Sequence, residues 1–406
     1  MKDMKPIHYL VLAVLLAVAV MGTLQIAGIS DPIVFLADVI EDLPKAADQV
    51  ANLEAFKPVE SATEAPGEEP TEVSTEAPTE APTEAPTEAP TEAPTEPQPE
   101  HFVLTFVGDC TLGSNAKAVN YKSAFLNLVG ENFDYPFKNV LSYFENDEWS
   151  FANLEGTLGD QGTKVTKEYN FRGPASYTEF LTRNSVDVVT LANNHTYDYG
   201  EAGFAETKRL LEEAGVPFAE HEGSITVTTE NGLTIGLYAL DFVRGAPKVE
   251  QVTAQIRQLK ETGVDLVVCA FHWGRENTYN PTDTQKEYGR AAIDAGANIV
   301  WGHHPHVLQP VEAYNGGVIY YSLGNFVFGG NSAPKDLDTA IIQQEVIRDV
   351  DGTVSLGEMT IIPCSVSSEG GQNNFQPTPY AADTNEYGRI MRKLTGEYRG
   401  GNLPIG

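Results

Sequence analysis

Cysteine is scarce in this chain of 406 residues, which contains three and no Cys-x-x-Cys pair. A structural zinc site built from thiolates is therefore not expected, and an odd number of cysteines argues against a disulfide framework. Two of the three, among Cys110, Cys269 and Cys364, lie within or beside apolar runs. We expect these thiols to be buried and to behave as small hydrophobic side chains.

Basic residues are also few, because 26 Lys and Arg stand against 57 Asp and Glu and the net charge is −31. Proteins that bind nucleic acid neutralise its phosphates with clustered Lys and Arg. We therefore expect no nucleic-acid partner.

One long run near the N-terminus, Tyr9 to Ile29, has no charged residue. At ~1.5 Å per residue a helix of this length spans the ~30 Å hydrocarbon core of a membrane. Lys2 and Lys5 precede the run and Asp31 follows it, which favours a cytoplasmic N-terminus and an extracytoplasmic remainder. Residues 1–30 are predicted to be a transmembrane signal-anchor in the cell membrane; a cleaved secretory signal is the alternative.

Residues 31–100 are poor in large apolar side chains, and their second half repeats the letters TEAP. From residue 41 to residue 100 there are sixteen Asp and Glu against two Lys, a net charge of −14. Recurring proline and mutual repulsion between glutamates prevent a packed core. This segment is predicted to be a disordered linker, extended at ~3.1 Å per residue where it is proline-rich. A glycosylated stalk is the alternative.

From residue 101 onward the sequence repeats one pattern, in which a short apolar run ends in polar residues and an amphipathic stretch generally follows. Such runs are typical of strands buried on both faces, and the alternation is typical of βα units. The pattern predicts helices over residues 175–184, 201–214, 248–262 and 283–295. Turns are expected at Glu230–Gly232 and Asp351–Gly352.

Together these elements predict a layered α/β domain, a four-layer αββα sandwich with two facing sheets and helices outside them. Its predicted bounds are residues 101–375, and a polar C-terminal tail covers residues 376–406. Because ligand sites of open α/β sheets collect beyond the carboxyl ends of the strands, the polar clusters should form one site.

The side chains in these clusters are carboxylates, a carboxamide and imidazoles. The candidate metal ligands are Asp109, Glu155, Asn194, His272, His304 and His306. Oxygen and imidazole donors without thiolates suit Mn, Fe or Zn, and this number of ligands is enough for one or two divalent ions.

The stretch WGHHPHV contains three of the eight histidines. On an extended segment, residues two apart point to the same side, so His304 and His306 are expected to face the site while His303 faces away. A surface turn whose histidines bind nothing is the alternative for an H-x-H pair taken alone.

Further residues have candidate roles beside the metal ligands. His195 and Asp198 are three apart, so the carboxylate can hold the imidazole as a general acid. The candidate substrate-binding residues are Arg172, Trp273, Glu276 and Asn325. Arg172 can clamp an anionic group; a solvated surface arginine, and ordinary packing for Trp273, are the alternatives.

Seven motifs in order, FVGDCTLG, ANLEGTL, FRGP, LANNHTYDYG, FHWGRE, GHHPHVLQPVE and YSLGNFVF, resemble the capsule synthesis protein CapA family, which is associated with bacterial poly-γ-glutamate synthesis. That family is similar in turn to calcineurin-like metallophosphoesterases, and the resemblance implies their αββα sandwich. It also implies metal ligation by the six candidate ligands. The sequence departs from the metallophosphoesterase pattern where Thr111 replaces a histidine, Glu155 an aspartate and Asn193 a glycine.

Two kinds of function follow from the resemblance. The first is an extracytoplasmic metal-dependent hydrolase or transferase of poly-γ-glutamate or capsule polymer synthesis. The second is a tethered, non-catalytic scaffold that binds the polymer or membrane subunits of its synthase. A general metal-dependent phosphoesterase is a third alternative. Because the TEAP tract repels an anionic polymer, polymer contact is expected on the globular domain.

Overall fold

The computed structural model describes residues 97–403, which belong to one compact unit. The predicted transmembrane segment and almost all of the predicted linker lie outside the described residues. Within residues 97–403, no helix is both long enough and apolar enough to cross a membrane.

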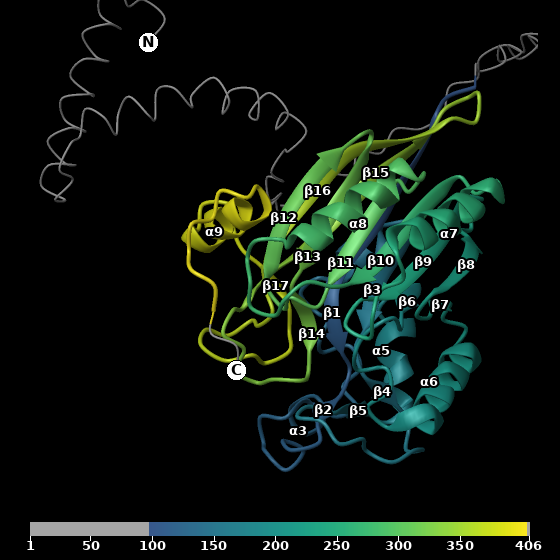
Figure 1. Ribbon diagram of the computed structural model, residues 1–406. Coiled ribbons are helices and arrows are strands. Elements are labelled where there is room, and N and C mark those ends of the chain that lie inside the picture. The colour runs from purple at the N-terminus through teal and green to yellow at the C-terminus, as the bar shows by residue number, and fades with distance from the viewer. Residues whose placement is uncertain (1–96, 404–406) are drawn as a thin grey trace, which may run out of the picture. The chain divides into compact units, whose positions relative to one another are not determined.

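The first sheet has a parallel centre and an antiparallel margin (Figure 1). Strand β1 pairs in parallel with β3, and the parallel ladder continues through β6 and β7, while β15, β16 and β17 run antiparallel beside it. A short strand, β14, also pairs with β1. The bounds are β1 Glu100–Thr111, β3 Trp149–Leu154, β6 Val188–Thr190, β7 Phe218–Ala219, β14 Asn325–Phe328, β15 Asp338–Arg348, β16 Val354–Ser365 and β17 Thr378–Pro379.

The second sheet has the order β12-β13-β11-β10-β9-β8. Its four central strands are parallel, and antiparallel hairpins form both edges, one of them the predicted hairpin around Asn231. The bounds are β8 Gly223–Thr228, β9 Thr234–Asp241, β10 Leu266–His272, β11 Ile299–His303, β12 Leu308–Tyr314 and β13 Gly317–Leu323. A third, small sheet joins β2 Ser114–Asn115, β5 Phe171–Gly173 and β4 Thr157–Leu158.

The two large sheets pack against each other through aromatic side chains. Phe106 of the first sheet lies edge-on to Trp301 of the second, with 5.7 Å between ring centroids. The indole of Trp301 donates a hydrogen bond of 2.9 Å to the carbonyl of Val107. A buried indole that finds such a partner keeps its apolar area in the core without an unpaired donor.

Helices lie across the second sheet and beside the first (Figure 1). Helices α7 (Val249–Glu261) and α8 (Asp283–Asp294) bury an apolar cluster against the second sheet. Helices α5 (Glu179–Thr182) and α6 (Gly200–Ala214) pack in the cluster beside the first sheet. The mixed, layered α/β arrangement predicted from the sequence is therefore observed.

The observed helices differ from the predicted ones in three places. The stretch predicted as a helix over 175–184 is a 3-10 turn, Ala175–Thr178, followed by α5. Two short helices, α3 (Phe125–Leu128) and α4 (Leu141–Glu145), had no prediction. Helix α9 (Asn385–Leu394) forms within the segment described from sequence as a polar tail.

Charged side chains hold α9 against the sheet that contains β15. Lys393, only 2% exposed, lies 2.5 Å from Asp336 and 2.7 Å from Asp338. Arg389 donates two hydrogen bonds of 2.7 Å to Asp338. A buried cation is tolerated when it is fully paired, so this network fixes α9 to the first residue of β15 and to the loop before it.

Candidate metal centre

The polar side chains converge at the carboxyl ends of strands from both large sheets, as the sequence predicts. Asp109 lies near the end of β1, in register with Asn153 of β3, and Glu155 follows β3. In the second sheet His272 ends β10 beside His303, which ends β11. Adjacent parallel strands place their carboxyl ends at one edge, which explains the convergence.

Asp109 is fully buried and surrounded by donors. Its Oδ1 accepts a 2.8 Å hydrogen bond from Asn153 and lies 3.3 Å from Nδ1 of His303, while its Oδ2 lies 3.2 Å from Nδ1 of His306. Burial alone would raise the pKa of Asp109, but hydrogen bonds from the two histidines outweigh it and hold the pKa well below its ordinary value. Asp109 is therefore ionised in the folded protein.

Glu155 is fully buried, and neither of its carboxylate oxygens has a hydrogen-bond partner among residues 97–403. Three imidazole nitrogens face its Oε1: Nε2 of His272 at 3.8 Å, and Nε2 of His195 and of His306 at 3.9 Å each. Burial, reinforced by the nearby Asp109 charge, raises the pKa of Glu155 well above its ordinary value. A buried carboxylate without a partner is costly, so the arrangement needs a further positive group.

The imidazoles of His272 and His304 are suited to ligation. Burial lowers the pKa of His272 well below its ordinary value and that of His304 to about 3. Both rings are therefore neutral and each keeps a nitrogen lone pair. Nε2 of His272 lies 2.8 Å from Oδ1 of Asn194. Two ligand atoms bound to one ion at ~2.1 Å lie about 3 Å apart, so this spacing fits a common ion.

These observations test whether the residues fit a divalent ion. Two groups bring their donor atoms within 4.8 Å of one another in the described part of the chain: Asp109, Glu155 and His306, and also Glu276, His304 and His306. The unpartnered oxygens of Glu155 and the neutral imidazoles are a donor set for Mn, Fe or Zn. The residues therefore fit a divalent cation.

The H-x-H stretch reaches the site by a different geometry from the predicted one. His304 and His306 have φ angles of 94° and 57°, so the segment is a turn and the extended-strand argument is wrong. His303 does not face away either, because its ring lies 3.3 Å from Asp109. All three imidazoles thus belong to the site, with His303 supporting the first carboxylate.

His195 and Asp198 make the expected contact. Nδ1 of His195 lies 2.8 Å from Oδ2 of Asp198, and Lys167 lies 2.5 Å from the other oxygen of that carboxylate. The imidazole stacks on Phe171 with 4.2 Å between ring centroids. Burial lowers the pKa of His195, although Asp198 opposes this. The ring is therefore neutral, with Nδ1 held by Asp198 and Nε2 facing Glu155.

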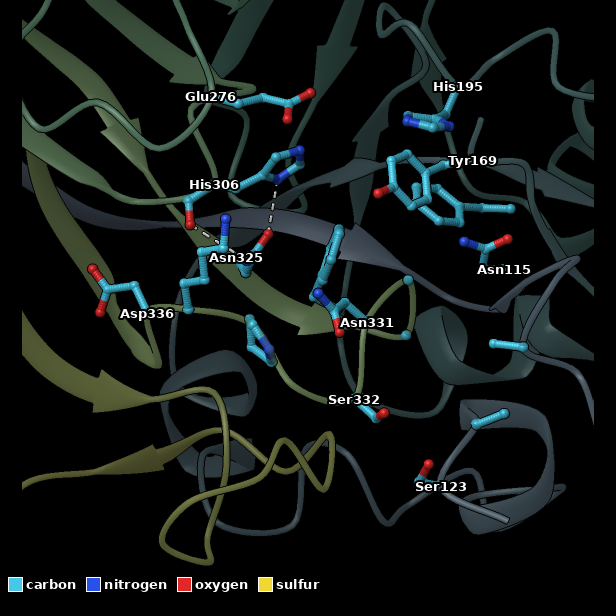
Figure 2. A pocket seen from close by; sticks show the side chains of 18 of the residues that line it. Asn115, Ser123, Tyr169, His195, Glu276, His306, Asn325, Asn331, Ser332 and Asp336 are labelled. Atoms are coloured by element: carbon cyan, nitrogen blue, oxygen red, sulfur yellow. Dashed lines mark hydrogen bonds between the residues drawn. The ribbon is translucent and has the colours of Figure 1, made fainter. Parts of the chain in front are cut away.

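A pocket of about 450 Å³ opens beside these residues. His195, Glu276, His306 and Asn325 line it, and Asn325 also lies 2.9 Å from Nδ1 of His306. Figure 2 shows His195 and Tyr169 on one side of the pocket and Glu276 with His306 on another. Two residues predicted to bind substrate, Glu276 and Asn325, thus lie in its wall.

The other two predicted substrate-binding residues lie elsewhere. Arg172 stacks on the ring of Tyr199 at 3.3 Å and donates to the carbonyls of Asp160 and Gln161, which leaves its guanidinium turned from the pocket. Trp273 is buried under α7 and α8 and donates a 2.9 Å hydrogen bond to Tyr321. It packs the core, which was the alternative interpretation.

Two asparagines that were not among the predicted site residues connect the cluster. Asn153 donates to Asp109, and Asn193 donates to Oδ1 of Asn153 at 3.0 Å. The sequence could have indicated Asn153, because residues two apart on a strand share a face and Glu155 was already predicted as a metal ligand. Lys167, which pairs with Asp198, lies in an irregular loop where the sequence offers no such signal.

Sequence comparisons match most of the described domain. A profile described as bacterial capsule synthesis protein PGA_cap matches residues 103–330. The capsule biosynthesis protein CapA of Bacillus anthracis is 30% identical over 330 residues, 75% of this chain and 75% of that protein. The PGA biosynthesis protein CapA of Bacillus subtilis (strain 168) is 29% identical over 319 residues, 72% and 77% of the two chains.

Among solved structures, the NAD nucleotidase of Haemophilus influenzae aligns with 74% of this chain and 63% of its own. The identity is 12% and the TM-score 0.37, a likeness too weak to support an argument about activity.

Proposed function

The chain belongs to the bacterial capsule synthesis protein family, and on that premise we propose that it is a metal-dependent hydrolase or transferase in the synthesis of poly-γ-glutamate or a related capsule polymer. The names of the two Bacillus relatives support the polymer, and the donor set around Glu155 supports the metal. The observation that carries the proposal is the fully buried Glu155 carboxylate, which faces imidazoles and has no hydrogen-bond partner among residues 97–403.

Residues of this chain would hold the metal and orient the substrate. The ligands would be the six side chains predicted from sequence, Asp109, Glu155, Asn194, His272, His304 and His306. A divalent ion bound there would supply a Lewis acid that polarises a substrate oxygen and activates water. Asn325, held against His306, would orient a polar group of the substrate in the pocket.

His195 would move the proton. Because its Nδ1 is held by Asp198 and its pKa is lowered by burial, the resting ring has a free lone pair on Nε2. It therefore accepts a proton from the attacking group first and then donates it to the leaving group. This order adds a base step to the general-acid role predicted from sequence.

The proposal also places the domain outside the cell, held at the membrane by residues 9–29 and separated from it by the acidic segment. Its support is the uncharged run flanked by Lys5 and Asp31 in the sequence. The polymer and membrane subunits of its synthase are the proposed partners. The net charge of −31 supports the absence of nucleic acid from that set.

The first test is metal analysis of the purified full-length chain and of a His304→Ala, His306→Ala double variant. We expect near-stoichiometric Mn, Fe or Zn in the wild type and its loss in the variant. A folded wild type that contains no metal and binds no added Mn²⁺ would reject the catalytic proposal in favour of a tethered scaffold.

A further inference from the structure

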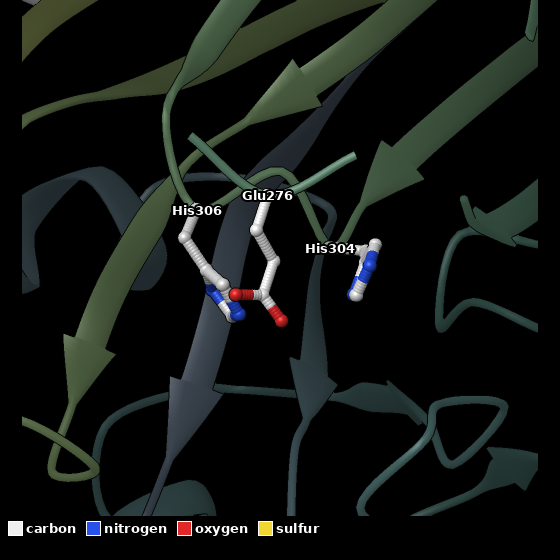
Figure 3. Close-up of side chains that lie close together, drawn as sticks. All are labelled: Glu276, His304 and His306. Carbon is white, nitrogen blue, oxygen red and sulfur yellow. The ribbon is translucent and has the colours of Figure 1, made fainter. Parts of the chain in front are cut away.

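Glu276 is not one of the six metal ligands predicted from the sequence, yet it approaches the H-x-H turn. It lies on the loop after β10, and one carboxylate oxygen lies within 4.8 Å of ligand nitrogens of both His304 and His306. Figure 3 shows the carboxylate projecting between the two rings. Within the part of the chain described by the structure, no hydrogen bond or ion pair engages it.

The backbone beside Glu276 is tied to that same turn. The amide of Asn277 donates a 2.8 Å hydrogen bond to the carbonyl of Pro305, the residue between the two histidines. From the other side, Leu403 donates to the carbonyl of Asn277 at 3.0 Å and Asn402 accepts from Tyr279 at 3.1 Å. The loop therefore holds its position against the turn while the exposed Glu276 side chain remains able to move.

The donor chemistry of the three residues is that of a metal site. Carboxylate oxygens and imidazole nitrogens bind Zn²⁺ at ~2.0–2.2 Å, so ligand atoms on one ion lie about 3–4 Å apart. The present separations of up to 4.8 Å need only a small inward movement of Glu276. Two imidazoles and one carboxylate are a ligand set for Zn or Fe that leaves positions open.

Competition for His306 separates this group of ligands from the group formed by Asp109, Glu155 and His306. Both groups include His306, and one nitrogen of that ring binds one ion at a time. An ion that takes His304 and His306 with Glu276 leaves Asp109 and Glu155 to the remaining candidates, Asn194 and His272. Glu276 and His306 also line the 450 Å³ pocket, so open positions at the outer ion would face substrate.

We infer that Glu276 is a metal ligand which, with His304 and His306, forms an outer metal position at the wall of the pocket, distinct from an inner position at Asp109 and Glu155. This inference rests on the proposed function, because it assumes that the cluster binds divalent ions. It extends that function by assigning to the outer ion the contact with an oxygen atom of the substrate.

The test is a titration of the full-length protein, stripped of metal, with Zn²⁺ followed by calorimetry and by elemental analysis after desalting. The variants are Glu276→Gln, which keeps the shape and removes the charge, and Glu250→Gln, a matched change at an exposed position on α7. We expect two equivalents in the wild type and in Glu250→Gln. Glu276→Gln should retain one equivalent and bind the second at least tenfold more weakly.

Glu155→Gln separates failure of this inference from failure of the proposed function. If Glu276→Gln binds Zn²⁺ as the wild type does, or if the wild type binds one equivalent only, the outer position is refuted. If the outer position is refuted in this way but Glu155→Gln loses Zn²⁺ binding, the proposed metal site at Glu155 is still supported. A wild type that binds no Zn²⁺ refutes both. Because Glu276 is exposed, its variant should keep the metal-free melting temperature, which checks the fold.

Discussion

The Glu155→Gln variant should be more stable than the wild type without metal and less stable than the wild type with metal. In the metal-free wild type, burial raises the pKa of Glu155, so the folded state binds its proton more tightly than the unfolded chain. Such a group contributes stability below its unfolded pKa, and this contribution is lost as the pH rises through the folded value. At neutral pH the carboxyl is therefore a liability without metal.

The magnitude follows from the absence of hydrogen-bond partners for this carboxyl among residues 97–403. A buried charged group left unsatisfied costs more than a neutral one; Gln keeps the shape and a polar amide but removes the charge, and we take about 1–3 kcal/mol for the difference. A stability change of 1 kcal/mol shifts Tm by ~2–4 °C in a large domain, so metal-free Glu155→Gln should melt ~2–12 °C above the wild type. A metal at 100 times its Kd adds about 2.7 kcal/mol, and the wild type alone gains this from an ion that Glu155 holds.

The assay is calorimetric melting at pH 7 in chelator and in saturating Mn²⁺, with the exposed Glu250→Gln variant as the control. The expected order is variant above wild type in chelator, with Mn²⁺ raising the Tm of the wild type by more than that of the variant. A variant that melts below the metal-free wild type, or that gains as much from Mn²⁺, would refute the assignment of Glu155 as a metal ligand.

Three further predictions follow from the same contacts. Burial lowers the pKa of His306, but Glu155 and Asp109 outweigh it and raise the pKa to about 10. Metal binding at pH 7 should therefore displace a proton from His306, and the affinity for metal should rise with pH. Calorimetric titrations in buffers of different ionisation enthalpy measure the released proton, and equal apparent enthalpies would contradict the prediction. His195→Gln should lower turnover of polymer ~10²–10⁴-fold with metal content unchanged, measured as chain ends released or transferred; unimpaired turnover would exclude the proton-transfer role. Lys393→Met should cost about 3–5 kcal/mol in urea unfolding, because Asp336 and Asp338 lose their buried partner, and a loss below ~1 kcal/mol would show that the network is dispensable.

The convergence of the metal-ligand candidates was predictable because it depends on strand ends. Asp109, Glu155 and His272 each follow or end an apolar run, and parallel packing brings such ends together whatever the details of the loops. The helical periodicity of the amphipathic stretches also predicted the bounds of α6, α7 and α8 closely.

What the sequence did not predict depends on loops and on distant partners. Histidine is enriched at positive φ, but this weak signal did not outweigh the apolar run before it, so the turn at His304 and His306 was interpreted as an extended segment. Helix α9 is mostly polar, and its docking depends on Asp336 and Asp338, which precede it by about fifty residues in the chain. Arg172 had two interpretations in sequence, an anion clamp and a solvated surface arginine, and the ring of Tyr199 decides its position.

Strand β1 has a consequence for how the protein can be handled and presented. The chain enters the first sheet at Glu100, in register with Arg348, and reaches Asp109 nine residues later. At ~3.3 Å per residue these two points are ~30 Å apart along the strand. Attachment through the N-terminus, to a bead, a sensor surface or a bilayer, therefore acts on the end of the domain opposite the pocket and leaves the mouth of the pocket free for the proposed polymer substrate.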